Sequence, residues 1–468
     1  MSLFRKKSIA DLVRGTQGGA GLRKTLGATD LVLLGIGCII GTGIFVLTGV
    51  AAAKYAGPGI MLSFVLSGLA CAFAALAYSE LSSMVPVTGS AYTFTYVSMG
   101  EIVAFAVGWA LICEYTIGSA AVAAGWSGYM VGLLKSMGIV LPQAWTAVPA
   151  DGGILNVPAV LITAFLSYLL MLGTRESANL NKILVAIKLA CIAIFLFLAT
   201  PHIEPLNWHP FLPFGWSGVS AGAAIVFFAY IGFDTVSTAV EECKNPNRDI
   251  PVGIVGSLIV CTILYIAVAA VLTGVVPYSS LNNSEPVAYA LRAIGMNFGS
   301  ALVAIGAICG ITTVLLVFMY GQTRIFLAMA RDGMIPQSLV KIHPKYGTPH
   351  IITLVAGGVV SVLSGLLPIN IIAELCNMGT LFAFILVAVG VGVLRKTQPD
   401  AERPFRCPAV KIVVPMAVLL CGYLIANLPR ETMEFFAAWY VIGMIVYFTY
   451  SRKNSAMAPK ENDFSQKG

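Results

Sequence analysis

The residues Gly-Ile-Gly-Cys-Ile-Ile-Gly-Thr-Gly-Ile-Phe at positions 35–45 decide how this chain folds. Glycines stand at positions 35, 37, 41 and 43 of an apolar run, and each costs about 1 kcal/mol relative to alanine inside a helix. Gly37 and Gly41 have the spacing of small residues at a helix–helix contact, but Gly41-Thr42-Gly43 is denser than packing requires. We interpret the stretch as a local unwinding, which presents backbone N–H groups at the start of a half-helix to an anion such as a carboxylate.

The rest of the chain is also poor in charge. Of its 468 residues, 58% are hydrophobic and 10% are charged, and the mean hydropathy is +0.88, whereas an ordinary soluble protein is about 25% charged. This composition excludes a soluble enzyme, a nucleic-acid-binding protein and a disordered protein. The lipid bilayer is therefore an expected partner and nucleic acid is not, because the net charge of +7 comes mostly from residues between the apolar runs.

The apolar runs predict an all-α membrane protein with twelve transmembrane helices, since a helix needs about 20 residues to cross the bilayer. The expected spans are 29–53, 58–84, 100–134, 155–173, 180–200, 219–242, 251–276, 299–330, 350–368, 371–394, 410–428 and 432–450. Residues 1–28 precede them as an N-terminal segment, and residues 451–468 follow as a polar tail.

The basic residues orient these spans, because loops rich in Lys and Arg stay in the cytoplasm. With the N-terminus inside, all but five of the 28 Lys and Arg residues fall on the cytoplasmic side; the exceptions are Lys188, within a span, and Lys54, Lys135, Arg292 and Arg430, outside. We therefore expect a multi-pass protein of the plasma membrane with both termini in the cytoplasm.

A second interruption lies in the sixth expected span, where residues 227–234 read Phe-Phe-Ala-Tyr-Ile-Gly-Phe-Asp. Carbonyl groups freed near Gly232 can accept hydrogen bonds from an ammonium group. Interruptions in the first and sixth spans predict two repeats of five spans, residues 29–200 and 219–394, with the last two spans at 410–450 appended. The second repeat is inverted because five is odd, as is typical of secondary transporters with a site at the membrane midplane. N–H groups on one broken helix and carbonyls on the other suit an amino acid.

Several motifs together resemble those of the amino acid–polyamine–organocation (APC) superfamily of permeases, and most closely the bacterial relatives of the cationic amino-acid transporters. Besides the two interruptions, they are Tyr-Ser-Glu-Leu at 78–81 with Pro86 and Gly89, Glu-Glu at 241–242 before Asn-Pro at 245–246, Gly-Gln-Thr-Arg at 321–324 before Arg-Asp-Gly at 331–333, and Arg-Pro-Phe-Arg-Cys-Pro at 403–408. The resemblance runs from about Leu22 to Tyr450. It implies the leucine-transporter fold, with spans 1–5 and 6–10 as inverted repeats.

The resemblance also implies where a substrate binds. The matching positions are Ile40, Thr42 and Gly43 for the substrate carboxylate, and the carbonyls of Phe228, Ala229 and Ile231 for its ammonium group. Phe318 would lie beside the side-chain pocket, where its ring leaves little room for an Arg or Lys substrate. Phe318 thus differs from the small residue that the resemblance implies at this position in a strictly cationic transporter.

Three charged residues inside apolar runs are explained neither by solubility nor by topology. Lys188 lies eight residues into the fifth expected span, about 12 Å deep at 1.5 Å per residue, which is too deep for its side chain to reach the interface. Glu114, in the third span, either lines the side-chain pocket, pairs with a basic substrate, or makes a structural hydrogen bond to a neighbouring helix. Asp234 is expected to hydrogen-bond within its own helix and not to bind substrate.

Lys188 is the residue on which we base the prediction of proton coupling. A buried Lys can gain and lose a proton near neutrality. The resemblance implies that Lys188 occupies what is a sodium site in other branches of the fold, in contact with carbonyls near Gly37, and that Thr312 and Thr313 match the hydroxyl side of that site. We therefore expect coupling to protons and not to sodium.

These features predict a secondary active transporter that carries L-amino acids together with protons. We expect no enzyme, because the sequence contains neither a His-Glu-x-x-His motif nor an intramembrane His cluster. We expect no metal and no cofactor, because the ten Cys residues show no Cys-x-x-Cys spacing. An amino-acid exchanger and a non-transporting sensor on the same fold stay open, as do the choice between neutral and cationic substrates and the oligomeric state.

Overall fold

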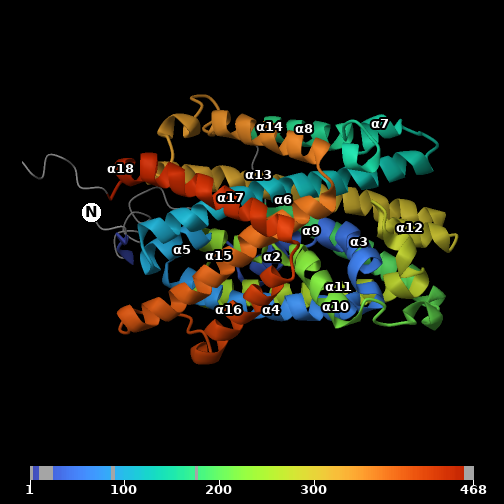
Figure 1. The fold of residues 1–468 in the computed structure, drawn as a ribbon, viewed down its shortest axis with the longest axis horizontal. Coiled ribbons are helices and arrows are strands. Elements are labelled where there is room, and N and C mark those ends of the chain that lie inside the picture. The colour runs from blue at the N-terminus through green and yellow to red at the C-terminus, as the bar shows by residue number, and fades with distance from the viewer. Residues whose placement is uncertain (1–3, 10–24, 86–89, 174–177, 458–468) are drawn as a thin grey trace, which may run out of the picture.

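The computed structural model describes residues 4–9, 25–85, 90–173 and 178–457. Across these residues the regular secondary structure is helical, apart from an isolated bridge between Leu26 and Cys243, so the predicted all-α class is confirmed. The long helices run roughly along the longest axis of the molecule (Figure 1). Some predictions fall outside the described residues: most of the segment 1–28, Pro86 and Gly89, and the tail beyond residue 457.

Eight helical stretches in the described chain are long and apolar enough to cross a bilayer, and four shorter apolar helices accompany them. The principal elements are α2 (Ala28–Ile39), α3 (Thr48–Ala51), α4 (Ile60–Met84), α5 (Ser90–Ser98), α6 (Glu101–Ser136), α7 (Gln143–Thr146), α8 (Val157–Met171), α9 (Ala178–Ala199), α10 (Gly215–Val226), α11 (Pro246–Val275), α12 (Pro286–Ala293), α13 (Asn297–Arg331), α14 (His350–Leu366), α15 (Ile369–Thr397), α16 (Val410–Ala426), α17 (Arg430–Val446) and α18 (Arg452–Asn454). The helix α2 is short because the chain breaks after it. The count of twelve spans and the inverted repeat stay predictions.

The chain is interrupted at both places where the sequence predicts it. The helix α2 ends at Ile39, Ile40 is extended, and the chain continues from Gly43 as a π-helix, η1 (Gly43–Leu47). In the second case α10 leads into a short 3₁₀ turn, η7 (Phe227–Tyr230), after which the chain continues from Phe233 as η8 (Phe233–Glu242). Between η7 and η8, Gly232 has a φ of +118°, which favours glycine because it has no Cβ.

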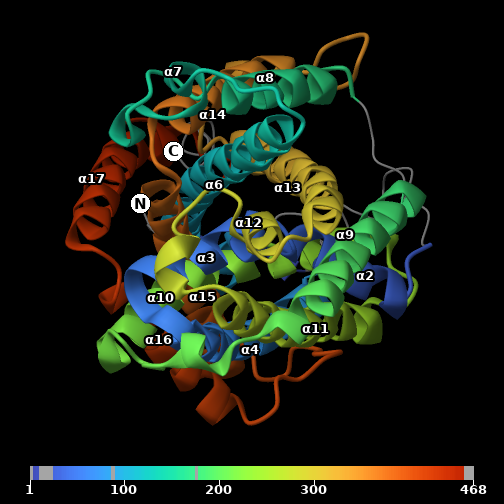
Figure 2. The same ribbon diagram turned by 90° about the vertical axis from the view of Figure 1, so that its right-hand side faces the viewer.

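The two longest helices, α6 and α13, lie on one side of these interruptions. Seen end-on in Figure 2, α6 and α13 lie next to each other within the bundle, and α8 and α14 lie outside them. The broken helix α2 packs against α9, α11 and α13. The short helices α7 and α12 lie at the end of the bundle opposite α18 (Figure 1).

A buried carboxylate joins α4 to α15 near the end of the bundle that carries α18. Glu80 accepts hydrogen bonds from Arg395 Nε at 2.8 Å and Nη2 at 2.6 Å, and its Oε1 lies 3.3 Å from Arg403 Nε. The backbone N–H of Cys407 donates to the same carboxylate at 2.8 Å. Glu80 therefore fixes the Arg-Pro-Phe-Arg-Cys-Pro segment against α4.

A second carboxylate at this end joins segments that are far apart in the sequence. Glu101, at the start of α6, lies 3.5 Å from Arg5 Nε and accepts hydrogen bonds from Tyr447 at 3.1 Å and from Ser455 at 2.7 Å. Asp332, just after α13, forms a comparable junction because it binds Lys7 Nζ at 2.5 Å and Tyr92 Oη at 2.7 Å. The described N-terminal residues are thus held against the body of the protein.

We predict that Glu80→Gln lowers the stability of the protein. Removing one partner of a buried ion pair costs about 3–5 kcal/mol, and Glu80 and Arg403 are 0% and 2% exposed. The midpoint of thermal unfolding in detergent, followed by size-exclusion chromatography, measures the effect. The matched control is Glu434→Gln, which breaks the exposed pair with Arg430 and is expected to cost less than about 0.5 kcal/mol. Equal midpoints for the two variants would contradict the assignment.

Candidate functional site

The two interruptions lie directly against each other. A Cβ atom at Gly43 would lie 2.3 Å from Ala229 Cα, and one at Gly232 would lie 2.8 Å from Cys38 O. The backbone of the first broken helix therefore touches the backbone of the second at two points. Only glycine allows this approach, and it brings N–H groups of one helix close to carbonyls of the other.

The N–H groups come from the start of η1. Phe45 N donates to Gly41 O at 3.3 Å, which is the first bond of this helical segment. The N–H groups that directly precede Phe45 therefore lie at a helix start, where N–H groups have no acceptor within the helix. Thr42 and Gly43 belong to this turn, and Thr42 is only 1% exposed. Ile40 differs from them, because its N–H closes α2 by donating to Ile36 O at 2.9 Å.

The carbonyl groups come from η7 and from Ile231, which directly follows it. Phe228 O accepts a bond from Ile231 N at 3.2 Å, and Ala229 O accepts one from Tyr265 Oη at 2.8 Å. A carbonyl oxygen has two lone pairs, so each of these groups can accept a second donor. The three predicted carbonyl residues lie together at the break.

Tyr265 of α11 is a residue that the sequence analysis missed. Its hydroxyl lies 2.8 Å from Ala229 O and 3.0 Å from Ile39 O, so one donor serves a carbonyl on each broken helix. The available signal was a tyrosine in the middle of an apolar span, because a buried tyrosine hydroxyl usually has a partner. Its partners, however, are backbone atoms, which no residue pattern identifies.

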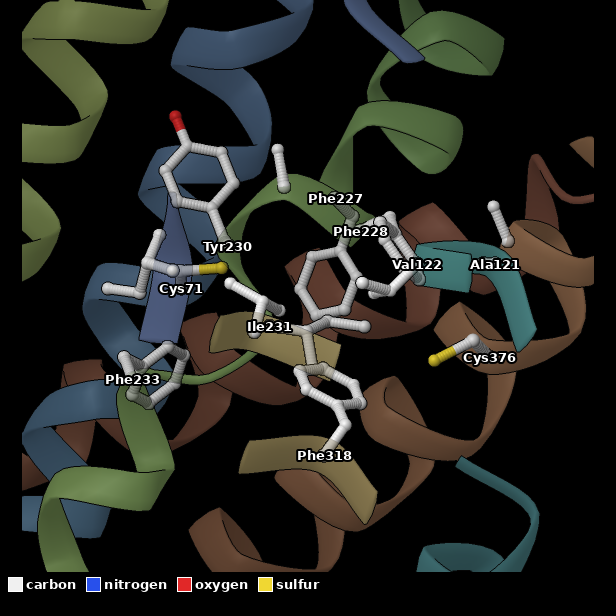
Figure 3. Packing of buried hydrophobic residues seen from close by; sticks show 14 of the residues in the cluster. Cys71, Ala121, Val122, Phe227, Phe228, Tyr230, Ile231, Phe233, Phe318 and Cys376 are labelled. Carbon is white, nitrogen blue, oxygen red and sulfur yellow. The ribbon is translucent and has the colours of Figure 1, made fainter. Parts of the chain in front are cut away.

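Apolar side chains from four segments pack together beside the break in the second helix. Figure 3 shows the ring of Phe318 directed toward Ile231, with Phe228 and Val122 nearby and Cys376 approaching from α15. All five side chains are buried. The Phe318 ring also packs edge-on against Tyr115 at a centroid distance of 5.8 Å. A substrate side chain here would meet apolar groups and aromatic rings.

Lys188 of α9 reaches the first broken helix. Its Nζ lies 2.5 Å from Gly37 O, and the residue is 0% exposed. A Cβ atom at Gly310 would lie 2.9 Å from Lys188 Cγ, so α13 packs against the lysine stem. The structure thus brings Lys188 and Gly37 together within one turn of the break.

The two threonines grouped with Lys188 bond mainly within α13. Thr313 Oγ1 donates to Gly310 O at 2.8 Å, and Thr312 Oγ1 donates to Ile308 O at 2.7 Å and accepts from Trp126 at 2.9 Å. Thr313 therefore binds the carbonyl of the glycine that contacts the Lys188 stem. Thr312 faces α6 through its bond with Trp126.

The two buried acids have different surroundings. Glu114 is 2% exposed and lies where α6 meets α15, with its Cβ 3.7 Å from the position of a Cβ at Gly379. Its Oε2 has no hydrogen-bond partner among the described residues, as is also true of Asn377 Oδ1 on α15. Asp234 instead lies at the start of η8, near the backbone of Gly232. Within the described chain, no group of three or more His, Cys, Asp or Glu residues is placed to hold a metal ion.

An all-helical membrane protein with two interrupted helices that meet in its interior has features typical of a membrane transporter. The chain belongs to the amino acid permease family, within the APC superfamily, because the family model described as amino acid permease matches residues 26–449. This confirms the resemblance that the motifs indicate.

Several relatives align with most of the chain. The branched-chain amino acid permease BcaP of Bacillus subtilis is 50% identical over 97% of this chain and 99% of its own length. The methylthioribose transporter of the same organism is 45% identical over 97% of this chain and 99% of its own length. The cationic amino acid transporter 9 of Arabidopsis thaliana is 41% identical over 90% of this chain and 76% of its own length.

We predict that Gly43→Ala strongly reduces amino-acid uptake. The new methyl group would overlap the backbone of Ala229, and overpacking of about 1–3 kcal/mol corresponds to a loss of about 5- to 150-fold in affinity for the substrate. Uptake of labelled amino acids by cells that express the variant measures the effect.

The matched control is Gly358→Ala on α14, where an added Cβ meets no atom within 4 Å. This variant should keep normal uptake. Both variants should be expressed at similar levels and elute as single species. Normal uptake by Gly43→Ala would show that the close approach of the two helices is not needed for transport.

Proposed function

We propose that this protein is a secondary active transporter that takes up L-amino acids together with protons by alternating access. The observation that carries the proposal is the contact between Lys188 Nζ and Gly37 O. It puts a residue that can gain or lose a proton against the helix whose broken end is proposed to hold the substrate. Family membership and the named relatives support amino-acid transport.

The substrate would lie between the two broken helices. The N–H groups of Thr42 and Gly43 would donate to its carboxylate, with the positive end of the η1 dipole adding to the attraction. The carbonyls of Phe228, Ala229 and Ile231 would accept from its ammonium group. Burial strengthens these contacts, because little water competes with them.

Lys188 would link the proton to the movement of the first broken helix. A protonated Lys188 in this dry environment is stabilised by donating to Gly37 O, since a buried charge without such a partner is costly. When the proton leaves, the charge-assisted bond weakens, and the end of α2 is released from α9. Proton release and rearrangement of the broken helix would then occur together.

The proposed topology has twelve spans with both ends in the cytoplasm of a plasma-membrane protein. Spans 1–5 (residues 29–200) and 6–10 (residues 219–394) would form the inverted repeats, with 410–450 appended. The interruptions, one in each half at corresponding positions, support this division. The first span would consist of α2 and the segment from Gly43 onward, which explains why α2 alone is short.

The substrate class that fits best is a neutral, apolar L-amino acid. The buried apolar side chains of Phe228, Ile231 and Phe318 lie together beside the break in the second helix, and the relative of highest identity among those named above is a branched-chain amino acid permease. The methylthioribose transporter has a name that points to a substrate without a carboxylate, so methylthioribose belongs in the panel of test compounds. In a variant whose pocket had room for a basic substrate, we propose that Glu114 Oε2 would face the side chain of that substrate.

We predict that purified protein in liposomes accumulates leucine, isoleucine or valine when the outside is more acidic than the inside. A sodium gradient alone should have no effect. Lys188→Met should abolish the acceleration by the pH gradient, because it keeps much of the side-chain volume but cannot carry a proton. The matched control is Lys182→Met on the same helix, where a half-exposed Lys pairs with Asp30, and it should keep the acceleration.

Three other outcomes would overturn the proposal. Uptake that needs sodium and ignores the pH gradient would remove proton coupling. Uptake only into liposomes loaded with amino acid would identify an exchanger. Binding of amino acids without accumulation would identify a sensor.

We predict that Phe318→Ser widens the substrate range toward larger or basic amino acids. The change removes a buried ring beside Ile231 and opens space in which a long side chain can approach Glu114. Competition by arginine and lysine against labelled leucine, compared between the variant and the wild type, measures the effect. If neither competes better in the variant, Phe318 does not limit substrate size.

A further inference from the structure

A cleft away from the central site lies between α8, α13 and α14 at the end of the bundle that carries α18. It has a volume of about 160 Å³, and its lining includes Tyr320, Arg324 and Arg331 of α13 and Thr348 just before α14. Arg324 and Arg331 are seven residues apart, which places them about two turns apart on one face of the helix. The two guanidinium groups therefore face the same cleft.

These two arginines are not neutralised by acidic partners in the described chain. Neither is part of an ion pair with a described carboxylate. Arg324 instead stacks on the ring of Tyr320, with its Cζ 4.6 Å from the ring centroid, and hydrogen-bonds the Tyr320 hydroxyl. The acid that follows Arg331, Asp332, is already bound by Lys7.

The opposite wall of the cleft is a loop held in a fixed conformation. Thr348 Oγ1 donates to Met171 O at the end of α8 at 2.6 Å, and His343 N donates to Thr348 O at 2.8 Å. The same loop carries the exposed Lys341 and Lys345. Lys341 directly precedes Ile342, which lines the cleft, so the loop carries positive charge close to the cleft in the chain.

Apolar side chains continue from the cleft along the outside of the bundle. Leu354 and Val355, in the first turns of α14, are 49% and 53% exposed, and Tyr168 near the end of α8 is 53% exposed. In a membrane protein such residues face lipid chains. The cleft consequently lies where the lipid-facing surface of α8 and α14 meets the basic end of the bundle.

We propose that this cleft binds the phosphodiester headgroup of an anionic phospholipid such as phosphatidylglycerol. Guanidinium groups bind phosphate oxygens through paired, charge-assisted hydrogen bonds. Arg324 uses the face of its guanidinium and its Nη2 on Tyr320, which leaves its other N–H groups to donate. Basic pockets between membrane helices suit lipid headgroups. A lipid is favoured over a soluble phosphate because the exposed apolar residues of α8 and α14 would contact its chains.

Native mass spectrometry of the full-length protein, released from a neutral detergent, tests this proposal. Phosphatidylglycerol, phosphatidylcholine and inorganic phosphate are titrated separately. We expect one phosphatidylglycerol to bind with at least about tenfold higher affinity than phosphatidylcholine, because each basic residue near an anionic headgroup contributes to binding. Inorganic phosphate should neither bind measurably nor displace the lipid.

The double variant Arg324→Gln/Arg331→Gln should lose this preference for phosphatidylglycerol. Arg324→Lys/Arg331→Lys should keep part of it, because the charge remains while the fork of donors is lost. The matched control is Lys396→Gln, which removes an exposed positive charge at the end of α15 outside the cleft.

Equal binding of the two lipids to the wild type would overturn the proposal, even if no variant could be purified. So would an unchanged preference in the double Gln variant, or an equal loss in Lys396→Gln. Binding of inorganic phosphate as tight as that of the lipid would show that the cleft is a phosphate site and not a lipid site.

Discussion

In the interior of a bilayer every backbone N–H and C=O group must find a partner within the protein, and this constraint governs the structure. Breaking two helices at midspan creates polar groups that lipid cannot satisfy, so neighbouring helices have to supply donors. Tyr265 of α11 bonds Ile39 O and Ala229 O, Asn377 of α15 bonds Ala224 O at 2.7 Å, and Ser67 of α4 bonds Ala223 O at 2.7 Å. These donors join α4, α11 and α15 to the two broken helices.

The site owes its polarity to the same breaks. The recognition groups that we propose are backbone atoms, while the side chains nearest to them, such as Phe228 and Phe318, are apolar. A site of this kind is fixed by helix geometry and can change its preferred side chain by substitution of a few lining residues. That division is consistent with a family in which close relatives carry names with different substrates.

The sequence predicts the helical class and both interruptions, since Gly41, Gly43 and Gly232 violate the pattern of an apolar helix. It also points to Lys188, because a lysine deep in an apolar run has no other explanation. It could not predict the role of Tyr265, because the partners of its hydroxyl are backbone carbonyls more than 30 residues away in the chain. Nor could it predict that the N–H of Ile40 is already bonded to Ile36 O. Nor does it show Arg324 and Thr348 facing each other, since that depends on how the loop before α14 folds onto α8.

The junction at Glu101 has a consequence for how the protein is made. Its carboxylate binds Arg5, near the start of the chain, and Ser455, near the end. A residue synthesised well before α6 and another synthesised well after it must therefore meet at one buried carboxylate. The junction at this end of the bundle is therefore completed only after α17 has been synthesised, because Ser455 follows that helix in the chain.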